Sequence, residues 1–320
     1  MRVPPVSVLM AAFNRERYIS AAIESVLAQT YDDFELIIVD DASTDRTVTV
    51  ARAYERLDSR VRVVVNDRNL GQFPNRNRAA ALARGPLLKY HDSDDLMYPH
   101  CLATFVSALE RYPEAGFALT TGSYWRGAPC PMLSTPRHSY EREFLGSGMF
   151  MGGPACALFR ADVFRRLGGF EEAGVFSDHL FWLRACATVP VVLVSGDLFW
   201  YRVHASQALR SRQAERDLLI VSPRVWSALR SAACPLGAAE REIARRNHAF
   251  ATLREAWRDA KQGRWRIGAE RLWRSGLSAR EWARYLRPPR RRPEAGSCVD
   301  EAGDYVLPRP EPTVGTAPVS

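Results

Sequence analysis

The chain has 320 residues, 47% of them hydrophobic, and a formal net charge of +8. This apolar content is ample for a buried core, but no run of 18 or more apolar residues occurs, so no membrane span is predicted. The six cysteines lack CxxC spacing, and the N-terminus lacks the apolar region of a signal peptide. We therefore expect reduced thiols in a cytoplasmic protein rather than a disulfide or zinc framework.

Strands and helices alternate along the first ninety residues. Ser43, Thr44 and Asp45 are candidate N-caps of the second helix. The alternation predicts a parallel sheet that is covered by helices on both faces. Apolar runs place the strands at residues 6–10, 34–39, 61–65 and 87–90, with amphipathic helices between them.

The pattern becomes mixed after Pro99. A span rich in Pro, Gly and Ser reaches to about residue 154, residues 207–286 are predicted to be helical, and the composition beyond Arg287 is typical of a disordered tail. The other expected elements are helices at 102–111, at 162–167 and from Asp178, and strands at 117–120, 155–159, 189–194 and 198–203.

Two predicted strands end in acidic clusters. Asp40-Asp41 follows the second strand, and His91-Asp92-Ser93-Asp94-Asp95 follows the fourth. The carboxyl ends of parallel strands are where open α/β folds bind ligands, and two Asp one residue apart can share a hard cation such as Mg²⁺. The alternative is a solvated turn in which Asp94 or Asp95 caps the next helix. The presence of two such clusters favours a site.

The first seventy residues contain no glycine. The first strand-to-helix turn reads Ala11-Ala12-Phe13-Asn14-Arg15, whereas dinucleotide-binding folds and P-loops need glycines there. This argues against a nicotinamide oxidoreductase and against a P-loop NTPase. It favours a nucleotide diphosphate whose phosphates are neutralised by a metal held on the carboxylates.

Eight segments resemble, in order and spacing, the motifs of family 2 glycosyltransferases, and together they extend over about residues 5–205. The resemblance implies a GT-A fold, in which a Rossmann-like nucleotide-sugar-binding half (1–115) and a smaller acceptor-binding half (116–206) share one sheet. It also implies inverting transfer from a nucleotide diphosphate sugar. The segments are residues 6–14, 25–31, 39–45, 69–71, 76–77, 91–95, 168–171 and 177–184.

By position, the resemblance assigns the nucleotide to one group of side chains. Phe13 would stack on the base, and Asp41 would accept a hydrogen bond from it. The full set implied for nucleotide binding is Ala11, Phe13, Asn14, Asp40, Asp41, Arg76, Asp92 and Ser93.

Asp92-Ser93-Asp94 matches the family's DxD motif. Asp94 would contact Mn²⁺ or Mg²⁺ directly, and Asp92 would bind the ribose or a metal-bound water. His204, in Tyr201-Arg202-Val203-His204, resembles a terminal histidine that contacts metal or diphosphate in related enzymes. A surface histidine is the alternative reading of this residue.

Asp178 matches the family's general base. An inverting transfer needs a carboxylate to take the proton of the acceptor hydroxyl as its oxygen attacks the anomeric carbon. The alternative is a helix N-cap, which is compatible with a position facing a cleft. The chain departs from the family in having Ser177 where Glu is common.

Residues 207–288 form a basic extension in which cations and aromatics alternate. Residues 210–292 hold 21 Arg or Lys against 8 Asp or Glu. One reading is contact with an anionic membrane surface; the other is a helical subdomain that buries its Trp faces and solvates its Arg. Nucleic-acid binding is disfavoured. The mixed residues are Arg254, Trp257, Arg258, Arg264, Trp265, Arg266, Arg271, Trp273, Arg274, Trp282, Arg284 and Tyr285.

The sequence therefore predicts four regions: 1–115, 116–206, 207–288 and a disordered tail, 289–320. The absence of a Gln-x-x-Arg-Trp signature favours the addition of one sugar, with a UDP-sugar as the favoured donor and a glycan or lipid-linked sugar as acceptor, in polysaccharide or glycoconjugate biosynthesis. A sugar nucleotidyltransferase is an alternative, but it is expected to carry a Gly-rich basic loop. A non-catalytic carbohydrate- or partner-binding module would not need Asp178 opposite a metal.

Overall fold

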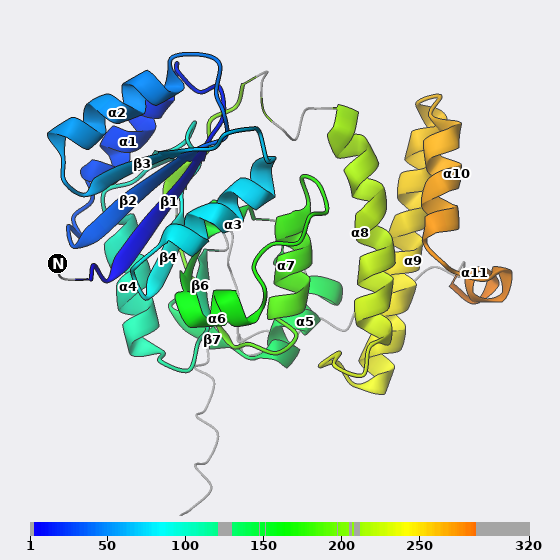
Figure 1. Ribbon diagram of the computed structural model, residues 1–320. Coiled ribbons are helices and arrows are strands. Elements are labelled where there is room, and N and C mark those ends of the chain that lie inside the picture. Colours follow the sequence, from blue (N-terminus) through cyan, green and yellow to red (C-terminus); the bar gives the residue numbers. More distant parts are fainter. Residues whose placement is uncertain are drawn as a thin grey trace, which may run out of the picture.

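The computed structural model describes residues 3–120, 130–146, 148–150, 152–196, 198–204, 207 and 212–285. Its centre is a sheet with the strand order β3-β2-β1-β4-β8-β6-β9-β7, and helices cover both faces (Figure 1). A small antiparallel pair, β5-β10, lies outside it. The architecture is the expected mixed α/β fold with a helical region at its C-terminal side.

The first half of the sheet confirms the predicted strand–helix alternation. β1 to β4 are all parallel, and every residue of β2 is buried. The N-cap of α2 is Arg46 rather than a Ser, Thr or Asp, although the Asp45 carboxylate accepts a bond from the Thr47 N–H at 2.9 Å. The bounds are β1 (Val6–Ala12), α1 (Ile19–Leu27), β2 (Phe34–Asp40), α2 (Thr47–Leu57), β3 (Val61–Val65), α3 (Gln72–Leu82) and β4 (Leu87–Tyr90).

The second half continues the same sheet. β8 is antiparallel to β4 on one side and to β6 on the other, so it joins the two halves through backbone hydrogen bonds. The Pro/Gly/Ser-rich span contains β7 and α5, which the pattern did not predict. The bounds are β5 (Leu96–Met97), α4 (Cys101–Arg111), β6 (Phe117–Thr120), β7 (Met132–Ser134), α5 (Pro136–Phe144), a 3₁₀ turn η1 (Pro154–Cys156), β8 (Ala157–Arg160), α6 (Ala161–Arg166), α7 (Ser177–Ala185), β9 (Val191–Val194) and β10 (Phe199–Trp200).

Each face of the sheet has its own apolar core. Helices α1, α2 and α4 cover one face, and α3, α6 and α7 cover the other. On the second face the aromatic rings pack densely: Phe159 of β8 stacks on Trp182 of α7 with ring centroids 5.6 Å apart and contacts Phe164 and Phe181. These rings fix α6 and α7 to the sheet.

The C-terminal extension is a helical layer packed against the second half (Figure 1). Val225 and Leu229 of α8 and Leu236 belong to the same apolar core as α7. None of the helices in the described ranges is both long and apolar enough to cross a bilayer. The predicted tail, 289–320, lies outside the described residues. The bounds are α8 (Arg212–Arg230), α9 (Ala238–Lys261), α10 (Trp265–Arg274) and α11 (Ala279–Tyr285).

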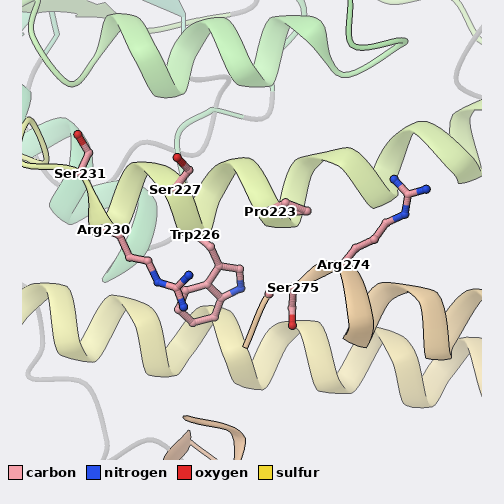
Figure 2. A pocket seen from close by; sticks show the side chains of 8 residues that line it. Pro223, Trp226, Ser227, Arg230, Ser231, Arg274 and Ser275 are labelled. Carbon is pink, nitrogen blue, oxygen red and sulfur yellow. The ribbon is translucent and has the colours of Figure 1, made fainter. Parts of the chain in front are cut away.

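A hollow of about 490 Å³ lies within this helical layer (Figure 2). Trp226 and Arg230 of α8 line it from one side, and Arg274 and Ser275 line it from the other. None of these residues follows a strand of the sheet, so the hollow is separate from the edge at which the acidic clusters lie.

Candidate active site

The loops after β1, β2 and β4 lie together because the three strands are parallel neighbours. Ala12 pairs with Asp40 at the ends of β1 and β2, and Leu9 pairs with Tyr90 of β4. The first two loops are tied to each other: the Asn14 N–H donates to Ser43 Oγ at 2.8 Å. The sheet thus brings both acidic clusters to one edge, as the sequence predicted.

Asp40 and Asp41 are both buried and organise these loops. Asp40 is fully buried and accepts bonds from the N–H and hydroxyl of Ser43 at 2.8 and 2.5 Å; burial raises its pKa. Asp41 accepts bonds from Asn66 Nδ2 and from the N–H groups of Leu70 and Gly71, at 2.7 to 2.9 Å. Base binding by these residues stays a prediction, and each also holds a loop in place.

Phe13 and Asn14 occupy the turn above these carboxylates. Phe13 is 42% exposed, as a ring that stacks on a ligand would need to be. Asn14 has φ of 52°, and its side-chain oxygen accepts a bond from the Thr44 N–H at 2.9 Å. This polar residue tolerates the left-handed region better than most, so it suits a tight turn that presents Phe13.

The DxD segment is held from both sides. Asp92 Oδ1 lies 2.5 Å from a guanidinium nitrogen of Arg76, and Ser93 Oγ donates to the carbonyl of Ala11 at 2.9 Å. Burial alone would raise the pKa of Asp92, but the charge and hydrogen bond of Arg76 hold it below its usual value. Asp92 is therefore ionised at neutral pH.

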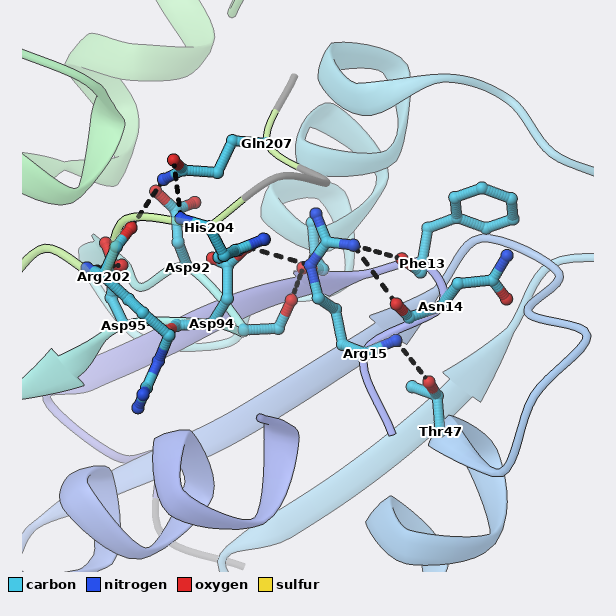
Figure 3. A network of polar contacts seen from close by, with 12 residues as sticks. Phe13, Asn14, Arg15, Thr47, Asp92, Asp94, Asp95, Arg202, His204 and Gln207 are labelled. Atoms are coloured by element: carbon cyan, nitrogen blue, oxygen red, sulfur yellow. Dashed lines mark hydrogen bonds and ion pairs between the residues drawn. The ribbon is translucent and has the colours of Figure 1, made fainter. Parts of the chain in front are cut away.

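Asp94 is the centre of a polar network that joins three segments (Figure 3). Its Oδ2 lies 2.9 Å from Nε of Arg15 and 3.0 Å from Nε2 of His204. Arg202 donates from its backbone N–H to Asp95 Oδ1 and from its side chain to the carbonyl of Asp94, at 2.9 and 2.8 Å. The structure thus brings His204 to the acidic cluster, whereas a metal-binding role for it stays a prediction.

The network contains residues that sequence reasoning missed. Arg15 was named only as part of a glycine-free turn, although a cation one loop away from an acidic cluster at the same sheet edge was a usable signal. Asp95 was named within the acidic cluster and as a possible helix cap, but it was given no role at the site. It is 1% exposed, and burial together with the charge of Asp92 raises its pKa to about 7.

Lys89 is a further buried cation near the cluster, and one of two lysines in the chain. It donates to the carbonyls of Tyr90, at 2.8 Å, and of Ala155 in η1. Burial lowers its pKa, and the carboxylates of Asp92 and Asp95 act in the opposite direction. Lys89 therefore connects β4 to η1 close to the acidic cluster.

Asp178 lies in the first turn of α7. Its Oδ1 accepts a bond from the His179 N–H at 2.7 Å. Burial raises its pKa to about 6; the charge of Arg76 opposes this rise and that of Asp92 adds to it, so both groups are within electrostatic reach. The N-cap position itself belongs to Phe176, so the cap alternative is wrong about position.

The loop before Asp178 is anchored by the helical extension. Asp217 of α8 accepts a bond from the Val175 N–H at 3.0 Å. Gly174 has φ of +71°, and a Cβ there would overlap the Asp217 carboxylate, so only glycine lets the loop pass this close. The extension therefore helps to position Asp178.

The side chains that could ligate a metal at this edge suit a hard divalent cation that is shared with a substrate. Within the described ranges, no three His, Cys, Asp or Glu side chains form a ready metal cage. Asp92 and Asp94 are 26% and 14% exposed at the side chain, and they offer carboxylate oxygens beside an imidazole. Two carboxylates with substrate phosphates are the usual protein share of a Mg²⁺ site, so these residues fit.

Sequence comparison identifies the family. Residues 7–168, half of the chain, match the family described as Glycosyl transferase family 2. An uncharacterized glycosyltransferase of Haemophilus influenzae is 34% identical over 64% of this chain and 67% of its own length. A putative teichuronic acid biosynthesis glycosyltransferase, TuaG of Bacillus subtilis, is 41% identical over 29% of this chain and 36% of its own length. The chain belongs to glycosyl transferase family 2. It is a glycosyltransferase.

Solved structures share the fold. TarS of S. aureus, residues 1–349 in complex with UDP, has a TM-score of 0.58 at 22% identity and covers 78% of this chain and 71% of its own. The mannosyltransferase PcManGT of Pyrobaculum calidifontis, in complex with GDP-Man and Mn²⁺, has a TM-score of 0.52 at 18% identity and covers 89% and 79%. These similarities establish the GT-A-like architecture.

Proposed function

We propose that this enzyme transfers one sugar, with inversion, from a UDP-sugar to a hydroxyl of a glycan or lipid-linked sugar. The observation that carries the proposal is Asp178, a half-buried carboxyl at the start of α7 that lies close enough to Asp92 for the charge of Asp92 to raise its pKa. An inverting, in-line displacement needs a base across the sugar from the leaving diphosphate, and Asp178 with the Asp92 segment would supply these two parts.

The donor would occupy the edge formed by the loops after β1, β2 and β4. Phe13 stacks on the base, Asp41 accepts from it, and Asp92 with Ser93 approaches the ribose. TarS was crystallised with UDP, which supports a uridine nucleotide. Arg76 and Arg15 flank the acidic cluster and offset its charge when the negative diphosphate binds.

A divalent cation, Mn²⁺ or Mg²⁺, would be held by Asp94, with Asp92 and His204 beside it. When bound, it neutralises charge that builds on the leaving diphosphate. Arg15 lies 2.9 Å from the same Asp94 oxygen, so its guanidinium must yield part of this contact to the cation. The Mn²⁺ in the PcManGT complex supports this cofactor choice.

Asp178 would take the proton of the acceptor hydroxyl. With a pKa of about 6 it is ionised at neutral pH yet more basic than an ordinary carboxylate, which suits a general base. The relationship with TuaG, a putative teichuronic acid biosynthesis glycosyltransferase, supports a role in polysaccharide or glycoconjugate biosynthesis.

The test is calorimetry with UDP, GDP and dTDP, each in Mn²⁺ and in EDTA. We expect UDP to bind most tightly and to lose about tenfold or more of its affinity in EDTA, because the carboxylates then repel the diphosphate. Asp94→Ala should remove the difference between the two buffers, whereas Asp162→Ala, on an exposed part of α6, should keep it. Equal UDP affinity in both buffers for the unaltered enzyme would refute the metal role.

A further inference from the structure

The tryptophans of the helical extension fall into two groups. Trp226 is 1% exposed and packs beside Tyr285 in a small apolar core, against which Trp282 is partly buried. In contrast, Trp257, Trp265 and Trp273 are 63%, 62% and 79% exposed. The expectation that the extension buries its Trp faces is therefore wrong for these three. Large exposed aromatics grouped in one region are typical of interaction surfaces.

The exposed tryptophans belong to one helical hairpin, α9–α10, and stand among cations. On α10, Trp265 and Trp273 are eight residues apart and share the outward face, while Gly268 and Arg271 lie buried against α9. Lys261 Nζ lies 5.5 Å from the Trp257 ring, and the Arg266 guanidinium lies 5.1 Å from the Trp265 ring. Residues 254–274 hold seven Arg or Lys and three Asp or Glu.

The hairpin is rigid at its turn. Asp259 is 4% exposed and accepts bonds from Arg264 at 2.7 Å and from Arg271 at 3.0 Å. These bonds connect the end of α9 to the end of the turn and to α10. A Cβ at Gly268 would lie 2.6 Å from the carbonyl of Ala256, so the two backbones are in close approach. The aromatics are thus displayed on a fixed scaffold.

We propose that the hairpin surface (Trp257, Lys261, Trp265, Arg266 and Trp273) docks on an anionic phospholipid membrane. Indole rings prefer the headgroup level of a bilayer, and nearby Lys and Arg are attracted to anionic lipid. The net positive charge of the surface complements that partner.

The position of the α9–α10 hairpin determines which side of the enzyme a docked membrane would face. In Figure 1 the turn between α9 and α10 lies at the same end of the molecule as the carboxyl ends of the parallel strands and the start of α8. A membrane that met the turn would therefore face the side on which the acidic clusters lie. An acceptor carried by a lipid would then be presented to the site.

The experiment measures binding of the full chain to vesicles that contain no acceptor, so it is independent of the transfer reaction. Co-sedimentation is compared for phosphatidylcholine vesicles and for vesicles of phosphatidylcholine and phosphatidylglycerol in equal parts. We expect binding to the anionic vesicles only, weakening with salt. The triple variant Trp257→Ala, Trp265→Ala, Trp273→Ala and the double variant Lys261→Gln, Arg266→Gln should each lose about tenfold or more of the partition coefficient.

Two matched controls accompany these variants. Leu57→Ala removes an 83% exposed apolar side chain from α2, and Arg56→Gln with Arg166→Gln removes two exposed cations elsewhere. Both should bind like the unaltered chain. Circular dichroism checks that the triple variant is folded. Equal binding of the triple variant and the unaltered chain, no binding to anionic vesicles at all, or self-association through the same surface without vesicle binding would each overturn the proposal.

Discussion

Asp178 is the residue whose replacement separates chemistry from binding. Asn keeps the size of Asp but cannot take a proton at neutral pH, so Asp178→Asn should keep donor affinity while transfer falls by roughly 10²–10⁴-fold. The unaltered enzyme should lose activity as pH falls through about 6, where this carboxyl becomes protonated. The measurements are calorimetry with UDP and pH–rate profiles of both proteins.

The same substitution makes a prediction about stability. The pKa of Asp178 is raised above its ordinary value, so the folded state holds this proton more tightly and loses that advantage as pH rises through about 6. Above that pH, Asp178→Asn should be the more stable protein by about 1–2 kcal/mol, after screening of the partly exposed group. A cap role predicts the opposite: a lower melting temperature and normal transfer.

Asp41 has a structural role that its predicted contact with the base did not reveal. Asp41→Ala would leave the N–H groups of Leu70 and Gly71 and the amide of Asn66 without this acceptor. We expect a stability loss of about 2–4 kcal/mol together with a raised donor KM and a smaller change in kcat. Thermal melts and steady-state kinetics measure both effects.

The matched control is Asn69→Ala, which removes only an exposed bond to the Gly71 N–H and should shift stability by about 0.5 kcal/mol or less. A destabilised Asp41→Ala enzyme with an unchanged donor KM would limit Asp41 to loop support.

For single residues, the sequence predicted the acidic side chains of the candidate site better than the basic ones. Carboxylates grouped after strands are visible in the printed order of residues. Arg15 and Arg202 are single cations in separate loops, and only folding brings them to Asp94 and Asp95. These contacts join residues 79 and 107 positions apart, so no local sequence pattern reveals them.

At the scale of elements, Gly268 controls how α9 and α10 pack. Alanine normally stabilises a helix relative to glycine by about 1 kcal/mol. Here the added Cβ would meet the Ala256 carbonyl at 2.6 Å, so Gly268→Ala should instead destabilise the hairpin by about 1–3 kcal/mol. Ala269→Ser, on the exposed side of α10, is the control, and hydrogen exchange of α10 is the measurement. Increased protection in Gly268→Ala would contradict the close packing.

The elements of the first half could be predicted because their signals are local. β1 and β2 are buried almost throughout and therefore appear as continuous apolar runs. β7 and α5 were missed because they lie in a stretch where Pro, Gly and Ser obscure periodicity. Of the strand predicted at 198–203, only Phe199–Trp200 forms β-sheet hydrogen bonds, because the following residues turn to contact Asp94 and Asp95. Pairing direction, as in antiparallel β8, depends on chain path and not on composition.

For the whole molecule, we expect the two halves to unfold in one transition, because β8 is hydrogen-bonded to both. Phe159 lies on this strand and packs against Trp182, Phe164 and Phe117. Phe159→Ala should cost about 3–5 kcal/mol and shift the urea midpoint equally by far-ultraviolet circular dichroism and by tryptophan fluorescence. Leu57→Ala, at an exposed site, should leave the midpoint in place. Two separate transitions in the variant would show that the halves unfold independently.

The position of β8 also bears on how such enzymes can diversify. A strand from the second half lies hydrogen-bonded between β4 of the first half and β6 of its own. If one half were exchanged for that of a relative, β8 would have to pair in the same register with β4 along the whole strand. Most such chimeras should therefore fail to fold. New specificities are more readily acquired by altering loops at the rim of the sheet. Loops can be exchanged between related enzymes, whereas the strands of the sheet have to be kept together.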